Sequence, residues 1–250
     1  MKNKKRILKR IFVVCIVFVI LGSIFYIQDG YSMDSTAKSA LHSTAAVIVK
    51  EERSATLFQP NKRTNTGLIF YPGGKVEYQA YAPLMQDFAK KGIYCVLVKM
   101  PLNLAVFDVN AADSYIQTTK NISNWYSGGH SLGGAMAAKY ADQHPKNLKG
   151  LLLLGAYSTQ DLTDTNLSCL AIYGSHDHIM NHGHWHKYRH DLPENTVVKI
   201  IKGGNHSQFG SYGLQNKDGL QNKDGKATIS PAKQQHETVE EAIKLMHIAN

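Results

Sequence analysis

The chain has 250 residues, of which 43% are hydrophobic, enough for one globular domain with a core and an appendage. Its formal net charge of +9 is uneven: residues 1–10 hold six basic side chains and no acidic one, and the rest of the chain holds 22 basic and 19 acidic residues. This composition excludes a disordered chain. It also gives no sign of nucleic-acid binding, because no basic patch with interleaved aromatic residues occurs.

The first predicted element is a membrane anchor. Residues 11–27, IFVVCIVFVILGSIFYI, contain no charge over seventeen positions and follow the basic segment 1–10. This pattern predicts a transmembrane signal anchor of a bacterial cell membrane, with segment 1–10 in the cytoplasm and the rest of the chain outside. A cleaved signal peptide is the alternative, although no small-residue cleavage site follows the apolar run. Residues 28–44 are small, polar and aperiodic, which predicts a tether to a folded domain at 45–250.

Short apolar runs alternate with helical patterns through residues 45–250. Most of the runs are continuously apolar, as strands buried on both faces are. The alternation predicts an α/β fold, with a doubly wound, mostly parallel sheet and helices on both faces. The predicted strands are 45–49, 67–71, 93–98, 150–154, 169–173 and 197–201, and the predicted helices are 78–91, 111–124, 131–144 and 232–248. Residues 214–225, LQNKDGLQNKDG, are an adjacent duplication of six residues, and their turn-forming composition predicts a surface loop.

The stretch YSGGHSLGGA, residues 126–135, is the most informative motif. Its glycines do not form a phosphate-binding loop, because Gly134-Ala135 stands where such a loop has Lys and Ser or Thr. The pentapeptide around Ser131 is instead G-x-S-x-G, between a short run and a predicted helix. A strand–turn–helix elbow of this kind strains the serine backbone and leaves its Oγ exposed above the sheet. Ser131 is therefore a predicted nucleophile, and the N–H of Leu132 is a predicted oxyanion donor.

A serine nucleophile needs a base, and the base needs an orienting acid. Asp177 follows the run CLAIY, and His206 follows the run VVKII, so both come just after the carboxyl ends of predicted strands. The order Ser131, Asp177, His206 predicts nucleophile, acid and base. Asp161, which follows the preceding strand, is the alternative acid.

The glycines after the run GLIFY predict the second half of an oxyanion hole. Gly74 is the expected N–H donor and Lys75 the alternative, because the backbone can approach a substrate closely there. The alternative interpretation is a simple turn that has no part in catalysis. Residues near the oxyanion loop and His206 that are expected to line a pocket, or else to be ordinary packing residues, are Lys75, Tyr78, Tyr81, Gln208 and Tyr212.

Residues 45–250 resemble the α/β-hydrolase superfamily, most closely its compact bacterial members of the dienelactone-hydrolase-like kind. The resemblance runs through FYPGGKVEYQAYAPL, GGHSLGGAMAAKYA, IYGSHD and GGNHSQFGSYG. It implies a sheet of about eight strands with Ser131, Asp177 and His206 as the triad. Pro72 stands where a histidine often opens the oxyanion-loop motif of the family.

The expected function is a membrane-anchored serine hydrolase, specifically a carboxylesterase that forms an acyl-enzyme and needs no cofactor or metal. Twelve residues, 157–168, separate the stretch LLLLGA from the run CLAIY where a lid is usually inserted, so small or accessible esters are the expected substrates. Amide hydrolysis, acyl transfer and a catalytically inactive binding protein stay open as alternatives. His178, His182, His186 and His190 lie four apart and could present a metal from one helical face, but a solvated surface is the preferred interpretation.

Overall fold

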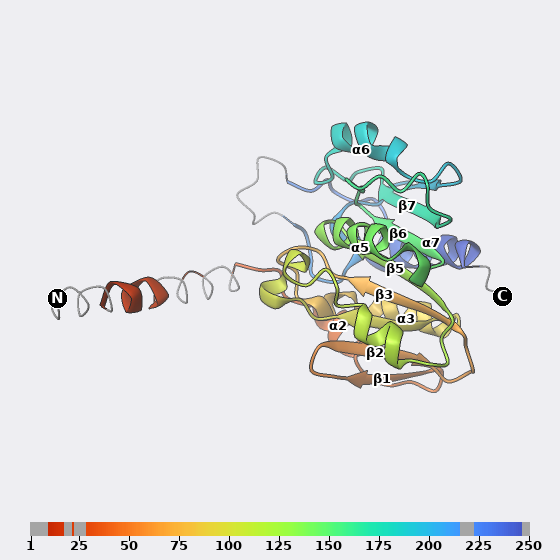
Figure 1. Cartoon of the computed structure of the whole chain (residues 1–250), viewed down its shortest axis with the longest axis horizontal. Helices are drawn as coiled ribbons and strands as arrows, with labels where there is room; N and C mark the ends of the chain where they lie inside the picture. Colours follow the sequence, from red (N-terminus) through yellow and green to blue (C-terminus); the bar gives the residue numbers. More distant parts are fainter. Residues whose placement is uncertain (1–9, 18–21, 23–28, 216–222, 247–250) are drawn as a thin grey trace. The chain divides into compact units, whose positions relative to one another are not determined.

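The computed structural model describes residues 10–17, 22, 29–215 and 223–246 (Figure 1). The chain divides into two compact units, Met1–Gly30 and Tyr31–Asn250. Residues 10–17 of the first unit are helical. Within the described part of the chain, no helix is both long enough and apolar enough to span a membrane. The predicted anchor, 11–27, includes positions 18–21 and 23–27, which lie outside the described residues.

The second unit is built on an eight-stranded sheet with the order β1-β2-β4-β3-β5-β6-β7-β8. Strand β2 runs antiparallel to β1 and β4, whereas the other neighbouring pairs are parallel. This confirms the predicted mostly parallel α/β sheet of about eight strands. The strands are β1 (Val47–Glu51), β2 (Ala55–Pro60), β3 (Thr66–Tyr71), β4 (Tyr94–Val98), β5 (Asn124–His130), β6 (Gly150–Leu154), β7 (Ser168–Gly174) and β8 (Val197–Ile201).

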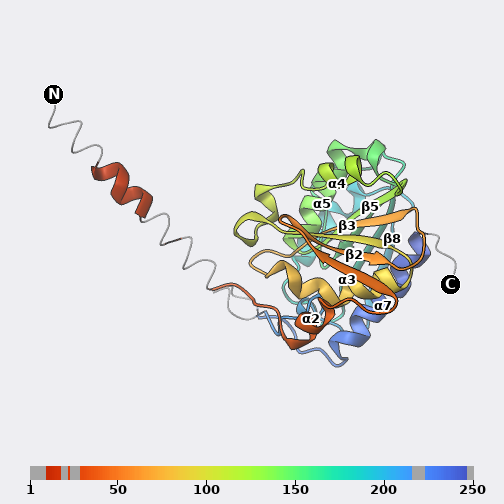
Figure 2. The same ribbon diagram turned by 90° about the horizontal axis from the view of Figure 1, so that it is seen from below.

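Helices cover both faces of the sheet. Figure 2 shows α2, α3 and α7 on one side of the strands and α4 and α5 on the other. The α-helices are α2 (Ser35–Ala40), α3 (Ala82–Lys90), α4 (Asp113–Thr118), α5 (Leu132–Gln143), α6 (His182–Tyr188) and α7 (Pro231–Leu245). Short 3-10 helices are η1 (Tyr78–Tyr81), η2 (Pro101–Asn103), η3 (Ala105–Phe107), η4 (Pro145–Asn147), η5 (Arg189–Asp191) and η6 (Ser207–Phe209).

The central strands are apolar throughout because successive side chains enter two different cores. Along β3, Leu68 and Phe70 pack in the cluster that contains residues of α3 and α7, whereas Ile69 and Tyr71 pack in the cluster that contains residues of α4 and α5. A strand covered on one face would alternate between apolar and polar residues instead. The lack of alternation therefore explains why helices could be predicted on both faces of the sheet.

Two strands of the sheet, β2 and β5, were not among the six predicted runs. Strand β2 carries Thr56 and Gln59, and β5 carries two glycines, so neither forms a continuous apolar run. Glycine is needed in β5 for close packing, because a β-carbon at Gly128 would lie 2.9 Å from Leu152 Cβ on β6. Tertiary packing therefore outweighs local strand propensity at these positions.

The predicted helix at 111–124 is shorter in the structure. Helix α4 covers Asp113–Thr118, since the chain must reach the start of β5 at Asn124. The predicted helix at 78–91 divides into η1 and α3. Helix α7 ends at Leu245, and positions 247–248 of the predicted helix lie outside the described residues.

From Tyr31 onwards, the segment predicted as a tether at 28–44 belongs to the same compact unit as the sheet. Tyr31 N–H donates to the Lys75 carbonyl oxygen at 2.8 Å, and Tyr31 O accepts from Glu77 N–H at 2.8 Å. Helix α2 follows and is capped by Asp34, while the Gln86 side chain of α3 donates to the Ala40 carbonyl oxygen at 3.1 Å. The small, polar composition of the segment hides this packing in the sequence, although Tyr31 and Ala40 are buried in the core.

Candidate active site

The turn at Ser131 joins β5 to α5. Ser131 has φ 52° and ψ −123°, a strained combination for a residue with a side chain, and its N–H donates to the Leu154 carbonyl oxygen at 2.9 Å. Such strain costs on the order of 1–3 kcal/mol. A β-carbon at Gly129 would lie 2.5 Å from Gly133 C, and one at Gly133 would overlap the Tyr71 carbonyl oxygen. The glycines therefore provide steric clearance for the strained elbow.

Asp177 and His206 form a buried pair at the carboxyl ends of β7 and β8. His206 Nδ1 lies 2.8 Å from Asp177 Oδ2, and both side chains are fully buried. The other carboxylate oxygen, Oδ1, accepts from Ile179 N–H at 3.0 Å and from Met180 N–H at 2.8 Å. Burial alone would raise the pKa of Asp177, but the charge of His206 and these hydrogen bonds outweigh it and hold that pKa below its usual value.

The second ring nitrogen of His206, Nε2, is not used by Asp177 and can accept a proton. His206 Nε2 is buried and has no hydrogen-bond partner among the described residues. The backbone around this histidine is fixed by Asp224, whose carboxylate accepts from His206 N–H at 3.2 Å and from Ser207 N–H at 2.8 Å. Gly155, with φ 52°, lies against the pair, and a β-carbon there would be 2.8 Å from His206 Nδ1. These contacts hold the imidazole in one place.

The predicted oxyanion loop lies beside the start of α5. A β-carbon at Gly74 would lie 3.1 Å from Leu132 Cδ2, so the two predicted donors are close together. Lys75, the alternative donor, already uses its N–H to donate to the Asn103 carbonyl oxygen at 2.9 Å. The hydrogen bonds found among the described residues engage neither Gly74 N–H nor Leu132 N–H. This arrangement leaves two backbone donors for a developing oxyanion.

His130, the residue before the nucleophile, was not predicted to have a role. It is fully buried, and its ring centroid lies 4.4 Å from that of His206. Its Nδ1 lies 2.7 Å from Tyr81 Oη, which accepts from Gly73 N–H at 3.1 Å. Burial, together with the nearby charge of His206, lowers the pKa of His130 well below its usual value. A neutral His130 and Tyr81 therefore connect the elbow, the oxyanion loop and η1.

The residues expected to line a pocket are mostly packed into the core. Tyr78 reaches Thr56 on β2, with 3.4 Å between the two hydroxyl oxygens, and Tyr212 packs its ring against Tyr31. The Gln208 amide donates to the Ile229 carbonyl oxygen at 3.1 Å. A substrate-lining role for these side chains stays a prediction, as it does for Lys75 and Tyr81.

Asp161 lies in its own loop, whereas the histidine run begins beside the acid, with His182 Nε2 2.9 Å from the Asp177 carbonyl oxygen. Asp161 is exposed, and its carboxylate accepts from the hydroxyl of Thr163 at 2.6 Å, so it fixes its own loop. Helix α6 begins at His182, which leaves His178 before the helix and His190 after it. In the described residues no group of three or more His, Cys, Asp or Glu side chains is arranged to hold a metal ion.

Sequence reasoning missed Tyr81's link to His130, the clearance at Gly155 and the role of Asp224. Gly155 directly follows the run LLLL, and a glycine after the strand before the acid's strand is a local signal that could have been read. Asp224 lies in the duplicated loop, part of which, 216–222, lies outside the described residues. Its partners are seventeen and eighteen residues away, so no local pattern indicates them.

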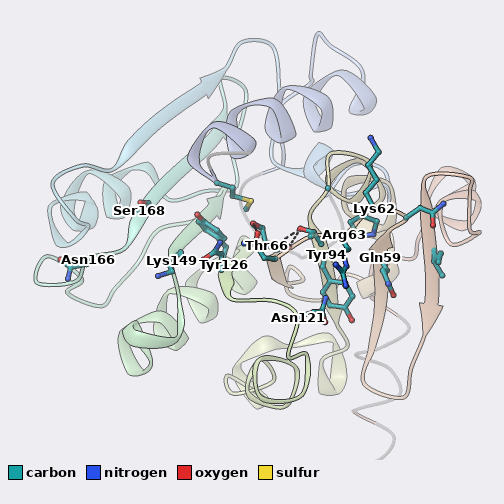
Figure 3. A pocket seen from close by; sticks show the side chains of 18 residues that line it. Gln59, Lys62, Arg63, Thr66, Tyr94, Asn121, Tyr126, Lys149, Asn166 and Ser168 are labelled. Atoms are coloured by element: carbon teal, nitrogen blue, oxygen red, sulfur yellow. Dashed lines mark hydrogen bonds between the residues drawn. The ribbon is translucent and has the colours of Figure 1, made fainter. Parts of the chain in front are cut away.

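A large cavity lies at the opposite end of the parallel strands from this site. It has a volume of about 1320 Å³ and opens at the amino-terminal ends of the parallel strands. Figure 3 shows the basic side chains Lys62, Arg63 and Lys149 around it, together with Thr66 at the start of β3. Ser131 and His206 come from the opposite, carboxyl ends of their strands, where parallel sheets place their sites.

A sequence profile described as the alpha/beta hydrolase family matches residues 67–236. Because this match covers most of the chain, and the fold and the strained serine turn agree with it, the chain belongs to the α/β-hydrolase family.

Solved structures show the same fold. Carboxyl esterase 2 from the mycorrhizal fungus Tuber melanosporum is 10% identical, with a TM-score of 0.59 over 84% of this chain and 88% of that one. Naproxen esterase (carboxylesterase NP) from Bacillus subtilis is 13% identical, with a TM-score of 0.52 over 73% of this chain and 91% of that one. At these identities the likeness shows the fold alone.

A curated relative is similar over a short stretch. A probable 1-acylglycerol-3-phosphate O-acyltransferase from Oryza sativa subsp. japonica is 56% identical over 36 residues, which are 14% of this chain and 9% of that protein. This chain therefore matches only a small part of the relative's length.

Proposed function

We propose that the chain is a serine hydrolase that cleaves small or accessible carboxylic esters through an acyl-enzyme. The observation that carries the proposal is the combination of a strained Ser131 at the start of α5 with a buried Asp177–His206 pair whose Nε2 has no partner among the described residues. A turn without a chemical role would need neither the strain nor the pair. Family membership supports the same conclusion.

In this mechanism His206 Nε2 takes the proton of Ser131 Oγ as the oxygen attacks the ester carbonyl carbon. Gly74 N–H and Leu132 N–H donate to the tetrahedral oxyanion, and Asp177 stabilises the imidazolium and its tautomer. The imidazolium then gives its proton to the leaving alcohol. Water, deprotonated by His206, releases the carboxylic acid and restores Ser131.

The test uses the purified full chain on p-nitrophenyl acetate and butyrate, with labelling by a fluorophosphonate probe. We expect Ser131→Ala to lose labelling and about 10⁴-fold or more of kcat. Ser39→Ala, an exposed serine of α2, is the matched control and is expected to keep both. Labelling and turnover that survive Ser131→Ala would exclude the proposed nucleophile.

The proposal includes a single-pass anchor at residues 11–27 in the cell membrane, with the hydrolase unit outside the cytoplasm. It rests on the uncharged run and on the six basic residues before it. Carbonate extraction of membranes and protease treatment of intact cells test it. The proposed anchor predicts a chain that stays in the carbonate-washed pellet and whose hydrolase unit is accessible from outside. Release into the carbonate supernatant would overturn it.

A further inference from the structure

An exposed apolar loop follows β4 at the carboxyl end of the sheet. Leu102, Val106 and Phe107, which we call the apolar rim, are 40%, 45% and 59% exposed. Single exposed apolar residues are common, but three within six positions of one loop form a local patch. Phe107 in particular leaves a large ring in water, so the loop has more apolar surface than solubility favours.

This loop borders the catalytic machinery. The Asn103 carbonyl oxygen accepts from Lys75 N–H at 2.9 Å, which ties the loop to the residue after Gly74. A β-carbon at Gly74 would lie 3.7 Å from Leu104 Cδ2 and 3.1 Å from Leu132 Cδ2. The apolar rim is therefore part of the loop that flanks the proposed oxyanion donors.

The loop is held in this form against backbone strain. Leu102 has φ 52° and Asn103 has φ 54°, two consecutive non-glycine residues in the left-handed region. Each such residue costs on the order of 1 kcal/mol or more, and glycine would remove the cost. The far end of the loop is tied down where Tyr71 Oη donates to the Val109 carbonyl oxygen at 2.7 Å. Folding therefore maintains the exposed position of the rim.

The chain enters the hydrolase unit along the same edge. Tyr31 pairs with the segment after Gly74, through Lys75 and Glu77, with two hydrogen bonds of 2.8 Å. In the sequence, only residues 28–30 lie between Tyr31 and the uncharged run 11–27. The four peptide steps from position 27 to Tyr31 therefore span at most about 14 Å when fully extended.

We propose that the apolar rim docks on the surface of the phospholipid bilayer that holds the anchor, and that the substrate is an ester whose acyl chain lies in that bilayer. The inference rests on the proposed function and on the proposed anchor. A short connection would keep the edge at Tyr31 near the lipid surface, and burial of Val106 and Phe107 in the interface would turn the neighbouring Gly74 and Ser131 towards it. The membrane-borne acyl ester then reaches Ser131 without leaving the bilayer for water.

The test compares two esters with the full chain reconstituted in phosphatidylcholine vesicles. One is a fluorogenic long-chain ester embedded in the same vesicles, and the other is water-soluble p-nitrophenyl acetate. The measured quantity is the ratio of the two turnover rates. We expect Val106→Ser/Phe107→Ser to lower this ratio about tenfold, because two apolar side chains no longer enter the interface.

The matched control is Val198→Ser/Ile200→Ser, on edge strand β8 at the far end of the sheet order, where the two side chains are 47% and 50% exposed. It is expected to keep the wild-type ratio. An equal fall in both variants, or no fall in the rim variant, would overturn the inference. If the double rim variant does not fold, the single substitution Val106→Ser carries the same comparison, with an expected fall of about threefold.

A second variant changes the connection and leaves the rim intact. Inserting a long Gly/Ser linker between Gly30 and Tyr31 is expected to lower the ratio several-fold. The reason is that the effective concentration of the proposed active site at the bilayer falls with linker length. An unchanged ratio after this insertion contradicts the role given to the short connection. Failure of the proposed function is distinguishable from both results, since it abolishes p-nitrophenyl acetate turnover and Ser131 labelling in the wild type.

Discussion

The two ends of the parallel strands differ in how their loops are fixed. At the carboxyl ends, buried polar contacts join loops that are distant in sequence, such as Asp177 with His206 and Tyr81 with His130. At the amino ends, the loops surround an open cavity of about 1320 Å³, and no described residue forms an ion pair with Lys62, Arg63 or Lys149.

The large cavity and the candidate catalytic residues therefore lie at opposite ends of the strands. The amino-end cavity is the larger space, yet its side chains are not arranged as a nucleophile, a base and an acid. The carboxyl end maintains backbone strain at Ser131 and a buried His206 nitrogen that has no hydrogen-bond partner among the described residues, both of which reduce stability. Substitutions that change a single atom or group at the carboxyl end should therefore lower activity, whereas substitutions at the amino end should be tolerated. The predictions below test this contrast.

The largest expected effect comes from the carboxylate that orients His206. Asp177→Asn keeps the shape of the side chain but removes the charge and permits the wrong imidazole tautomer, so we expect kcat to fall about 10⁴-fold. The matched control is Asp161→Asn, the alternative acid of the sequence, which is exposed and bonded to Thr163. It should keep kcat within about twofold, as surface substitutions usually do. Steady-state kinetics on p-nitrophenyl butyrate measure both, and a large loss in Asp161→Asn would reverse the assignment.

A smaller effect is expected when a β-carbon is added beside the Asp177–His206 pair. Gly155→Ala places a β-carbon 2.8 Å from His206 Nδ1, and Gly213→Ala, also at a positive φ, meets nothing within 4 Å. Both should lose about 1 kcal/mol of stability, because alanine is strained at a positive φ. Only Gly155→Ala should displace His206, and we expect a fall of about a hundredfold in kcat. Urea unfolding and kinetics together separate the two effects, and equal kinetics in the two variants would show that the contact is unimportant.

Much of the fold could be predicted from the sequence, because buried parallel strands leave continuous apolar runs such as LLLL before Gly155. Strands β2 and β5 could not, since polar residues and glycines interrupt them where neighbouring strands determine the packing. The helix after Ser131 could be predicted to within one or two residues, because the glycine turn marks its start.

The candidate triad could be predicted because each member follows a strand, and chain order supplies the pairing. The structure then brings Asp177 and His206 together and leaves Asp161 in its own loop. The contacts of Tyr81 with His130 and of Asp224 with His206 join residues at least eighteen positions apart. Such contacts depend on tertiary structure, so no periodicity in the sequence indicates them.

The buried His130 predicts that the stability of the folded chain depends on pH. Its pKa is lowered in the folded chain by burial and by the charge of His206, whereas in the unfolded chain it is about 6.5. Its contribution is therefore fully present above pH 6.5 and is lost as the pH falls below 6.5 towards the folded value. The unfolding free energy should therefore be lower at pH 5.5 than at pH 7.5, by on the order of 1 kcal/mol.

His130→Gln removes this titration, so its unfolding free energy should fall less than that of the wild type over the same interval. Tyr81 and His206 face the same ring and are present in both proteins, which is why the difference between the two proteins is the measured quantity. His236→Gln, at an exposed position of α7, is the control and should follow the wild type. Urea unfolding at pH 7.5 and 5.5 provides the values, and parallel losses in wild type and His130→Gln would contradict the neutral state of His130.

The smallest effect is expected at the amino ends of the strands. Replacing Lys62, Arg63 and Lys149 with Gln removes three positive charges from the cavity of Figure 3. The seven residues of β5 separate its amino end from Ser131 by about 20 Å, at a rise of roughly 3.3 Å per residue, which exceeds the screening length of about 8–10 Å at physiological salt. We therefore expect turnover of p-nitrophenyl butyrate within about twofold of the wild type, and stability within about 0.5 kcal/mol per substitution. A tenfold change in kcat would mean that the two ends are energetically coupled through the sheet, and the contrast between a catalytic and a tolerant end would no longer hold.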